Sequence, residues 1–125
     1  NTRLILYKRI AKARDTEELR DIQVEMIDRF GLLPKPLKNL FIHAELRVKA
    51  HKLGIRELDI TPTGGFIKFT KDTPISPQTL ISLLQQKPQQ YRLTNGNKLK
   101  ITYEMNSVEA RNAFITNLLE YLEVA

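Results

Sequence analysis

The spacing of apolar residues changes once along this chain, at Gly54, and the change limits the folds that are open to it. Before Gly54, apolar residues recur every three or four positions, which is the period of an amphipathic helix. After Gly54, short β-prone runs are mixed with further helical segments. This order is typical of the α+β class, in which helices cover one face of a small antiparallel sheet.

Three helices are predicted in the first part of the chain. The first covers residues 2–13. The second follows Asp15, which forms a capping pair with Glu18, and stops at Gly31, a residue that tolerates the backbone of helix ends. The third opens at Pro36, since proline suits a first helical turn. The apolar faces predicted for these helices contain Leu4, Tyr7, Ile10 and Ala11, then Leu19, Ile22, Met26 and Phe30, then Leu37, Leu40, Phe41, Ala44 and Val48.

Two β-hairpins are predicted in the second part, and a helix is expected after each. The loop 62–65 joins the first pair of strands, and Asn95-Gly96, a dipeptide typical of tight hairpin turns, joins the second. Ser76-Pro77 opens one helix, and Asn106 with Glu109 caps the last. The strands are predicted over 55–61, 66–70, 91–94 and 98–103, with Leu99, Ile101 and Tyr103 on the buried face of the last. The expected fold is α+β: three N-terminal helices, then two β-hairpins each followed by a helix, with helices packed on a small antiparallel sheet.

Length and composition indicate one domain of a cytoplasmic protein. A chain of 125 residues fits one core, and we predict a single domain over 1–125, with a helical part at 1–54 and a hairpin-containing part at 55–125. The chain begins at Asn1 without an initiator methionine, as a fragment of a larger protein would. It contains no cysteine, which excludes disulfides and suits a reducing cytoplasm, and no apolar run long enough to span a membrane.

Residue patterns that support catalysis or cofactor binding are sparse. Gly64-Gly65 is the only glycine pair, and no Gly-Lys-Ser/Thr follows it to form a phosphate loop. His43 and His51 lie eight residues apart in one predicted helix, but two imidazoles without a third ligand make a poor metal site, so we predict structural roles for both. No serine stands in a nucleophile-elbow context. We therefore expect no enzyme activity, no catalytic residue, no metal site and no cofactor in this domain.

Four acidic residues are predicted to share one side of the second helix, and we call them the acidic stripe. They are Glu18, Asp21, Glu25 and Asp28, spaced 3, 4 and 3 residues apart. At about 100° per residue they fall within about a quarter of the helix circumference. Two interpretations stay open: a solvated helix face, partly favoured by the helix dipole, or a docking surface for a basic partner.

A surplus of basic residues allows a different partner. Lys and Arg number 20 against 14 Asp and Glu, which gives a net charge of +6. This surplus permits contact with nucleic acid, for which phosphate-binding cations and stacking aromatic residues are needed. The candidate cations are Arg3, Lys8, Arg9, Lys12 and Arg14 in the first helix and Lys98 and Lys100 on a strand; the candidate aromatic residues are Phe66, Phe69, Tyr91 and Tyr103.

Five segments of the chain resemble the C-terminal domain of the bacterial transcription-repair coupling factors. They are residues 1–4 (NTRL), 6–10 (LYKRI), 25–34 (EMIDRFGLLP), 52–55 (KLGI) and 83–93 (LLQQKPQQYRL). The resemblance covers almost the whole chain and is looser over 61–75 and in the last helix. It implies a parent protein that is an ATP-dependent DNA translocase, which displaces stalled RNA polymerase and recruits the excision-repair protein UvrA, with ATP and Mg²⁺ bound elsewhere in that protein.

The resemblance also implies a role for this domain as an autoinhibitory lid. The lid packs on the UvrB-like N-terminal module of the same protein and masks the surface that binds UvrA. Glu25 and Asp28 lie inside a segment that carries the resemblance, so we expect them to contact arginines of that module, with Glu18 and Asp21 as further candidates. The alternative function is an accessory contact with DNA in the same motor protein.

Overall fold

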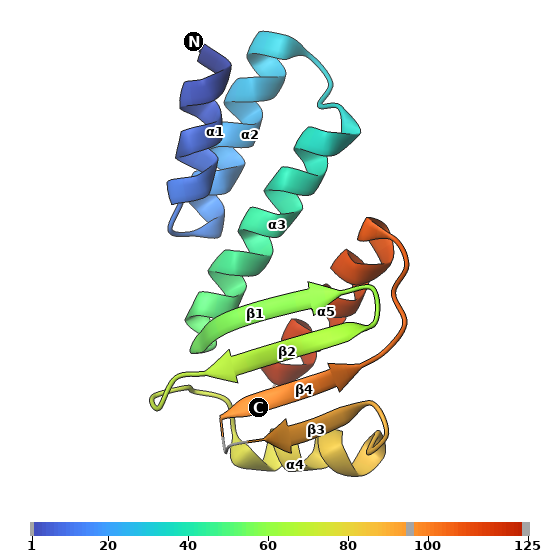
Figure 1. Ribbon diagram of the computed structural model, residues 1–125. Helices are drawn as coiled ribbons and strands as arrows, with labels where there is room; N and C mark the ends of the chain where they lie inside the picture. Colours follow the sequence, from blue (N-terminus) through green and yellow to red (C-terminus); the bar gives the residue numbers. More distant parts are fainter. Residues whose placement is uncertain (1, 95–96, 124–125) are drawn as a thin grey trace. The chain divides into compact units, whose positions relative to one another are not determined.

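The computed structural model describes residues 2–94 and 97–123, which form five helices and four strands in those ranges (Figure 1). The elements are α1 (Thr2–Lys12), α2 (Thr16–Phe30), α3 (Lys35–Lys52), β1 (Ile55–Thr61), β2 (Gly64–Phe69), α4 (Pro77–Gln86), β3 (Tyr91–Thr94), β4 (Lys98–Thr102) and α5 (Val108–Glu123). Their contacts divide the chain into two compact units, 1–48 and 49–125. The predicted α+β class and order of elements are confirmed.

The division between the units falls earlier than the change of pattern at Gly54. The last turn of α3 belongs to the second unit, where Ala50 and Leu53 are buried. The Thr73 hydroxyl also donates to the Leu53 carbonyl at 2.6 Å, which ties the end of α3 to the segment after β2. One continuous helix therefore contributes to both units, which a change of local periodicity cannot reveal. That residues 1–125 act as a single regulatory domain stays a prediction.

In the first unit, α1, α2 and most of α3 enclose one apolar core. Its members are Leu6, Ile10, Ala13, Leu19, Ile22, Met26, Leu33, Phe41, Ala44 and Val48. The prediction for α2 is confirmed except for Phe30, which is 43% exposed. The predicted face of α1 is confirmed at Ile10 but wrong at Leu4 and Tyr7, which are exposed, while Leu6 is buried. Residues 4, 7 and 11 have helical spacing, and so do residues 6, 10 and 13. Only packing against a neighbouring helix therefore decides which of the two sets is buried.

Local hydrogen bonds define the ends of these helices. Asp15 is the N-cap of α2, and its carboxylate accepts from the Glu18 amide at 2.7 Å, as the capping pair predicts. The carboxylate of Glu18 accepts in turn from the Arg14 amide at 3.1 Å. The guanidinium of Arg47 donates to the carbonyls of Ile10 (3.2 Å) and Ala13 (3.0 Å), where α1 ends and the last carbonyls of a helix need partners from outside it. These contacts join α1 and α2 at their shared turn and tie α3 to the end of α1.

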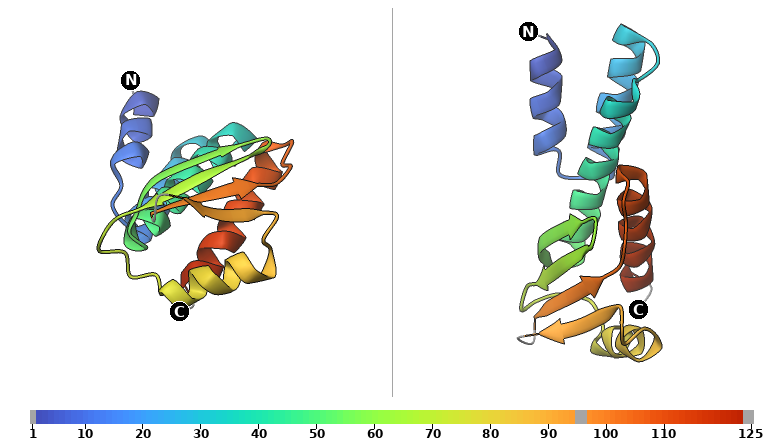
Figure 2. Two further views of the ribbon diagram at one scale, coloured as in Figure 1. Left: turned by 60° about the horizontal axis from the view of Figure 1, so that its bottom comes forward. Right: turned by 45° about the vertical axis from the view of Figure 1, so that its right-hand side comes forward.

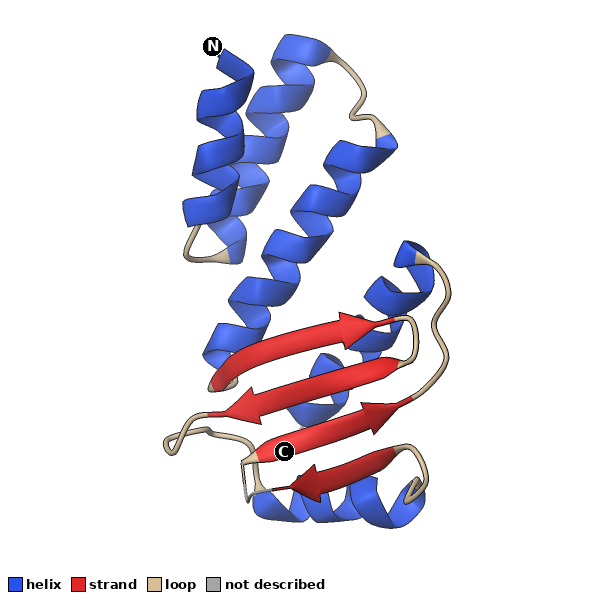
Figure 3. Cartoon of the chain, viewed as in Figure 1, coloured by secondary structure: helices blue, strands red, loops and turns tan. Residues whose placement is uncertain are grey.

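The second unit is built on a four-stranded antiparallel sheet with the order β1-β2-β4-β3. Ile67 of β2 lies opposite Leu99 of β4, and neither side chain is exposed to solvent. On the same face Tyr91 lies opposite Ile101. Figures 2 and 3 show α5 running along one face of the sheet and α4 beside β3. The apolar alternation of β4 therefore faces a helix, and its lysines face the other way.

Three details of the second unit differ from the predictions. Gly64 and Gly65 belong to β2 rather than to the loop, because their positive φ angles let the strand begin directly after Pro62-Thr63. Tyr103 lies beyond the end of β4 and is 48% exposed. The last helix is capped by Ser107, whose hydroxyl accepts from the Ala110 amide at 3.0 Å, and not by Asn106. The predicted turn at Asn95-Gly96 lies outside the described residues.

Candidate protein-docking surface

The structure separates the acidic stripe of α2 into two pairs of residues. Glu25 is half-buried and forms ion pairs with Arg9 of α1 and with Arg29, the latter at 3.4 Å. Glu18 accepts a hydrogen bond from the Arg14 amide, so its carboxylate is also held within the first unit. Both side chains therefore stabilise the contact between α1 and α2. Of the four predicted residues, these two are engaged inside the domain.

Asp21 and Asp28, by contrast, are exposed and form no ion pair or side-chain hydrogen bond with any described residue. They are seven residues apart on α2, so they lie on one side of the helix, two turns apart. An acidic side chain beyond the first helical turn gains little from the helix dipole, and Asp28 lies in the last turn. These two carboxylates are therefore available to a partner.

Two apolar side chains flank these carboxylates, and the predicted site did not include them. Val24 is 53% exposed and Ile27 is 41% exposed, although both are apolar residues within an α-helix. Neither belongs to the core cluster of the first unit. We define the α2 docking face as Asp21, Val24, Ile27 and Asp28. Their positions off the buried row 19-22-26 were visible in the sequence, and that is the signal that could have found Val24 and Ile27.

The predicted basic residues do not act as one cluster. In α1, Arg9 is paired with Glu25, while Lys8 and Lys12 are exposed. In the second unit, Lys98 and Lys100 lie on the outward face of β4. Of the predicted aromatic residues, Phe69 and Tyr91 are buried, whereas Phe66 shares the outward face of the sheet with these lysines. The structure thus brings only the strand lysines together with an aromatic ring.

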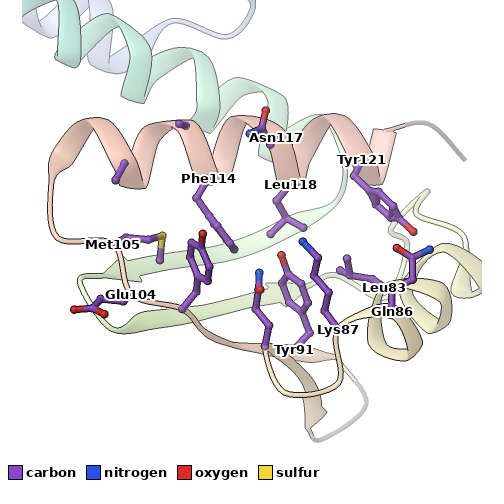
Figure 4. A pocket seen from close by; sticks show the side chains of 14 residues that line it. Leu83, Gln86, Lys87, Tyr91, Glu104, Met105, Phe114, Asn117, Leu118 and Tyr121 are labelled. Atoms are coloured by element: carbon purple, nitrogen blue, oxygen red, sulfur yellow. The ribbon is translucent and has the colours of Figure 1, made fainter.

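A groove of about 500 Å³ opens in the second unit between the end of α4, β3 and α5 (Figure 4). The Phe114 ring stacks with Tyr103 (centroids 5.2 Å apart) and with Tyr91 (6.3 Å). The charged lining residues are Lys87 and Glu104, and Figure 4 shows them apart from one another. The lining holds no histidine, no cysteine and no pair of carboxylates. Stacking of aromatic rings is the main feature of this groove.

Burial raises the pKa of the Tyr91 phenol above its ordinary value of 10.0; a hydrogen bond with Gln90 opposes the rise, and the charge of Tyr103 adds to it. Below pH 10 both the folded and the unfolded state keep this phenol neutral. Above pH 10 the unfolded state ionises first, so folding free energy is lost as the pH rises through the folded-state pKa. We expect Tyr91→Phe to reduce this loss, measured by urea unfolding between pH 8 and 11. Tyr7→Phe, at an exposed position of α1, is the control, and an equal effect of both variants would contradict the assignment.

No three His, Cys, Asp or Glu side chains in 2–94 and 97–123 are placed to hold a metal ion. His43 and His51, predicted to be structural, are both exposed on α3. No described helix has the length and apolar character needed to cross a membrane.

Comparison with known proteins gives this chain a family. Residues 1–80 match the family described as "TRCF domain". The transcription-repair-coupling factor of Escherichia coli K12 is 45% identical over 98% of this chain, and that of Haemophilus influenzae is 40% identical over 95%. The matched regions are 11% and 10% of those two proteins, so the chain spans about a tenth of their length.

A solved structure has the same fold. It is the crystal structure of the C-terminal domain of transcription-repair coupling factor, which matches with a TM-score of 0.69. The match covers 96% of this chain and 80% of that one, at 20% sequence identity. At 20% identity, this similarity supports the fold and no statement about function. It includes the α+β order of elements described above.

Proposed function

Because this chain belongs to the TRCF domain family, we propose that it acts as the regulatory lid of a transcription-repair coupling factor. In this proposal the lid packs on the UvrB-like N-terminal module of the same protein and masks the surface that binds UvrA. The parent protein is an ATP-dependent DNA translocase that displaces stalled RNA polymerase, and it binds ATP and Mg²⁺ outside this chain. This domain contributes contacts and no catalytic residue.

The observation that supports a docking role is the α2 docking face. Two unpaired carboxylates stand next to two exposed aliphatic side chains on one helix. Interfaces of this kind combine apolar burial, which contributes about 25 cal/mol per Å², with charges that set register and specificity. A partner surface complementary to this face is apolar and carries an arginine or lysine opposite Asp21 and another opposite Asp28. An arginine-bearing face on the N-terminal module has this chemistry.

A lid that opens needs a closed state of modest stability. Allosteric coupling free energies are typically about 1–3 kcal/mol. Exposed ion pairs contribute about 0.2–1 kcal/mol each, so two of them together with partial burial of Val24 and Ile27 reach this range. Glu18 and Glu25 are already held by Arg14 and Arg9, so they support the shape of α2. In the proposed closed state, Asp21 and Asp28 make the ion pairs between this domain and the N-terminal module.

The test is charge reversal in the full-length protein. We expect Asp21→Arg/Asp28→Arg to raise the affinity for UvrA about 5- to 150-fold, since it removes a coupling of the usual allosteric size. Affinity is measured by titration of full-length protein with UvrA. Glu25→Arg/Asp28→Arg is expected to open the lid too, but it also sets an arginine beside Arg9 and Arg29 and destabilises the contact between α1 and α2.

A matched control places the same two charge reversals elsewhere. Glu120→Arg/Glu123→Arg changes two carboxylates on α5, far along the chain from the α2 docking face. This control is expected to leave UvrA affinity as it is in the wild-type protein. If UvrA affinity were unchanged in Asp21→Arg/Asp28→Arg while circular dichroism showed a folded protein, the latch would not be on this face.

A further inference from the structure

The outward face of the sheet is strongly basic over β4 and β3. Strand register places the side chains of Lys98 and Lys100 on the face opposite to Leu99 and Ile101. The neighbours that share this face are Arg92 and Thr94 of β3, Phe66 and Lys68 of β2, and Glu57 and Asp59 of β1. Figure 1 looks onto this face, with α5 behind the sheet. Among the described residues of the second unit, no helix covers it (Figure 1).

The two halves of this face differ in charge. On the β1 side, Glu57 pairs with Lys68 at 3.3 Å. On the β4 and β3 side, Arg92, Lys98 and Lys100 form no ion pair with a described residue. The positive charge is therefore concentrated on the half of the sheet formed by β4 and β3, extended by Lys68 of β2.

The sheet places like charges directly opposite one another at two positions. Arg92 pairs in register with Lys100, and Lys98 pairs with Lys68. Like charges opposite one another on one face of an antiparallel pair are destabilising. These two like-charge pairs oppose folding, and a polyanionic ligand that neutralises both pairs would relieve the repulsion. We call Arg92, Lys98, Lys100, Lys68 and Phe66 the basic sheet face.

An aromatic ring lies at the centre of these cations. The Lys98 ammonium lies 4.4 Å from the centroid of the Phe66 ring, and that of Lys68 lies 5.6 Å from it. Phe66 is half-buried on the solvent side of the sheet, away from the apolar core formed by Ile67 and Leu99. Lysine side chains at such positions exchange readily between a ring and another partner, since exposed cation–π contacts contribute only about 0.5–1 kcal/mol. A flat π-surface among mobile cations can accept a nucleobase.

We propose that the basic sheet face binds single-stranded nucleic acid. The four cations contact phosphates, for which Lys68 exchanges the carboxylate of Glu57 for a phosphate, and one base stacks on Phe66 in place of a lysine. Single-strand binding surfaces combine cations along the backbone with aromatic side chains on which bases stack. An acidic peptide would use the cations but not the ring, and a duplex keeps its bases stacked inside. This proposal is independent of the lid function, because it concerns another element and another ligand.

The test is fluorescence anisotropy of a labelled oligothymidylate of about 20 nucleotides, titrated with the 125-residue chain. Four phosphate contacts on a single strand predict a slope of about −3 for log K against log salt, which is a loss of about 50-fold between 50 and 200 mM. Lys98→Gln/Lys100→Gln is expected to halve this slope, so the same change of salt costs about 7-fold. Phe66→Leu is expected to lower affinity about 5-fold or more without changing the slope.

The control variant is Lys8→Gln/Lys12→Gln, which removes two exposed cations from α1 and leaves the sheet intact. It is expected to bind oligothymidylate as the wild-type chain does. The proposal is overturned if this control loses as much affinity as the strand variant, or if no oligonucleotide binds at 50 mM salt. It is also overturned if Phe66→Leu has no effect, or if a polyglutamate peptide competes as well as the oligonucleotide at equal charge.

Discussion

Gly65→Ala is expected to destabilise the sheet unit by about 4 kcal/mol or more, because two costs coincide at this residue. The backbone of Gly65 has φ +143°, a region that residues with a Cβ rarely adopt. A Cβ at this position would also lie 1.9 Å from the carbonyl oxygen of Asp59. That oxygen is a backbone atom of the neighbouring strand β1, so it can move only if the β1–β2 ladder opens. Urea unfolding, followed by circular dichroism, measures the loss.

Gly31→Ala separates the two costs. Gly31 follows α2 with φ +80°, but a Cβ there would have no atom within 4 Å. This substitution therefore carries only backbone strain, about 1–3 kcal/mol. We expect it to be clearly milder than Gly65→Ala. Equal losses from the two variants would show that contact with the Asp59 carbonyl is not what limits Gly65.

Leu99→Ala is expected to cost about 2–5 kcal/mol of unfolding free energy. Leu99 is at 0% exposure in the centre of the sheet, between Ile67 of β2 and Leu93 of β3. Truncation removes apolar contacts and leaves a cavity that the strand backbone on either side cannot easily fill. Chemical denaturation of the wild type and the variant gives the difference directly, provided the slope against denaturant is unchanged.

Leu93→Ala is the matched control for Leu99→Ala. Leu93 is the cross-strand partner of Leu99, but it is 38% exposed on the edge strand β3. The same truncation there removes less buried area, and solvent can occupy the space. We expect a loss of about 1 kcal/mol or less. A loss as large as that of Leu99→Ala would mean that the edge strand is packed more tightly than its exposure indicates.

The candidate docking site could be predicted only in part. Helical spacing correctly placed Glu18, Asp21, Glu25 and Asp28 on α2, since the period of a helix is a local property. It could not show that Arg9, sixteen residues before Glu25, lies within ion-pairing reach of it. The spacing places Val24 and Ile27 off the buried row 19-22-26, but how far they are exposed depends on how many neighbouring helices pack against α2. The pattern identified a helix side, and tertiary contacts decided which residues on it are available.

The basic sheet face illustrates the same limit over a longer range. The alternation of polar and apolar residues along β4 is enough to predict that Lys98 and Lys100 lie on its solvent-exposed face. Their neighbours Phe66 and Lys68 come from a strand about thirty residues earlier. The sheet order β1-β2-β4-β3, in which β2 pairs with β4, brings them together. Two hairpins can be arranged in several orders, and local residue patterns do not distinguish between them.

The sequence by itself determined the local features of this protein. Asp15 and Ser76 begin helices because their side chains accept from backbone amides two or three residues ahead, within reach of any unfolded chain. The α+β order followed from apolar periods that neighbouring residues define. Only the tertiary structure decided that α1 buries Leu6 rather than Leu4, that Tyr103 stays exposed, and that β2 pairs with β4. Those choices depend on contacts between residues distant in sequence, whose energies no local pattern contains.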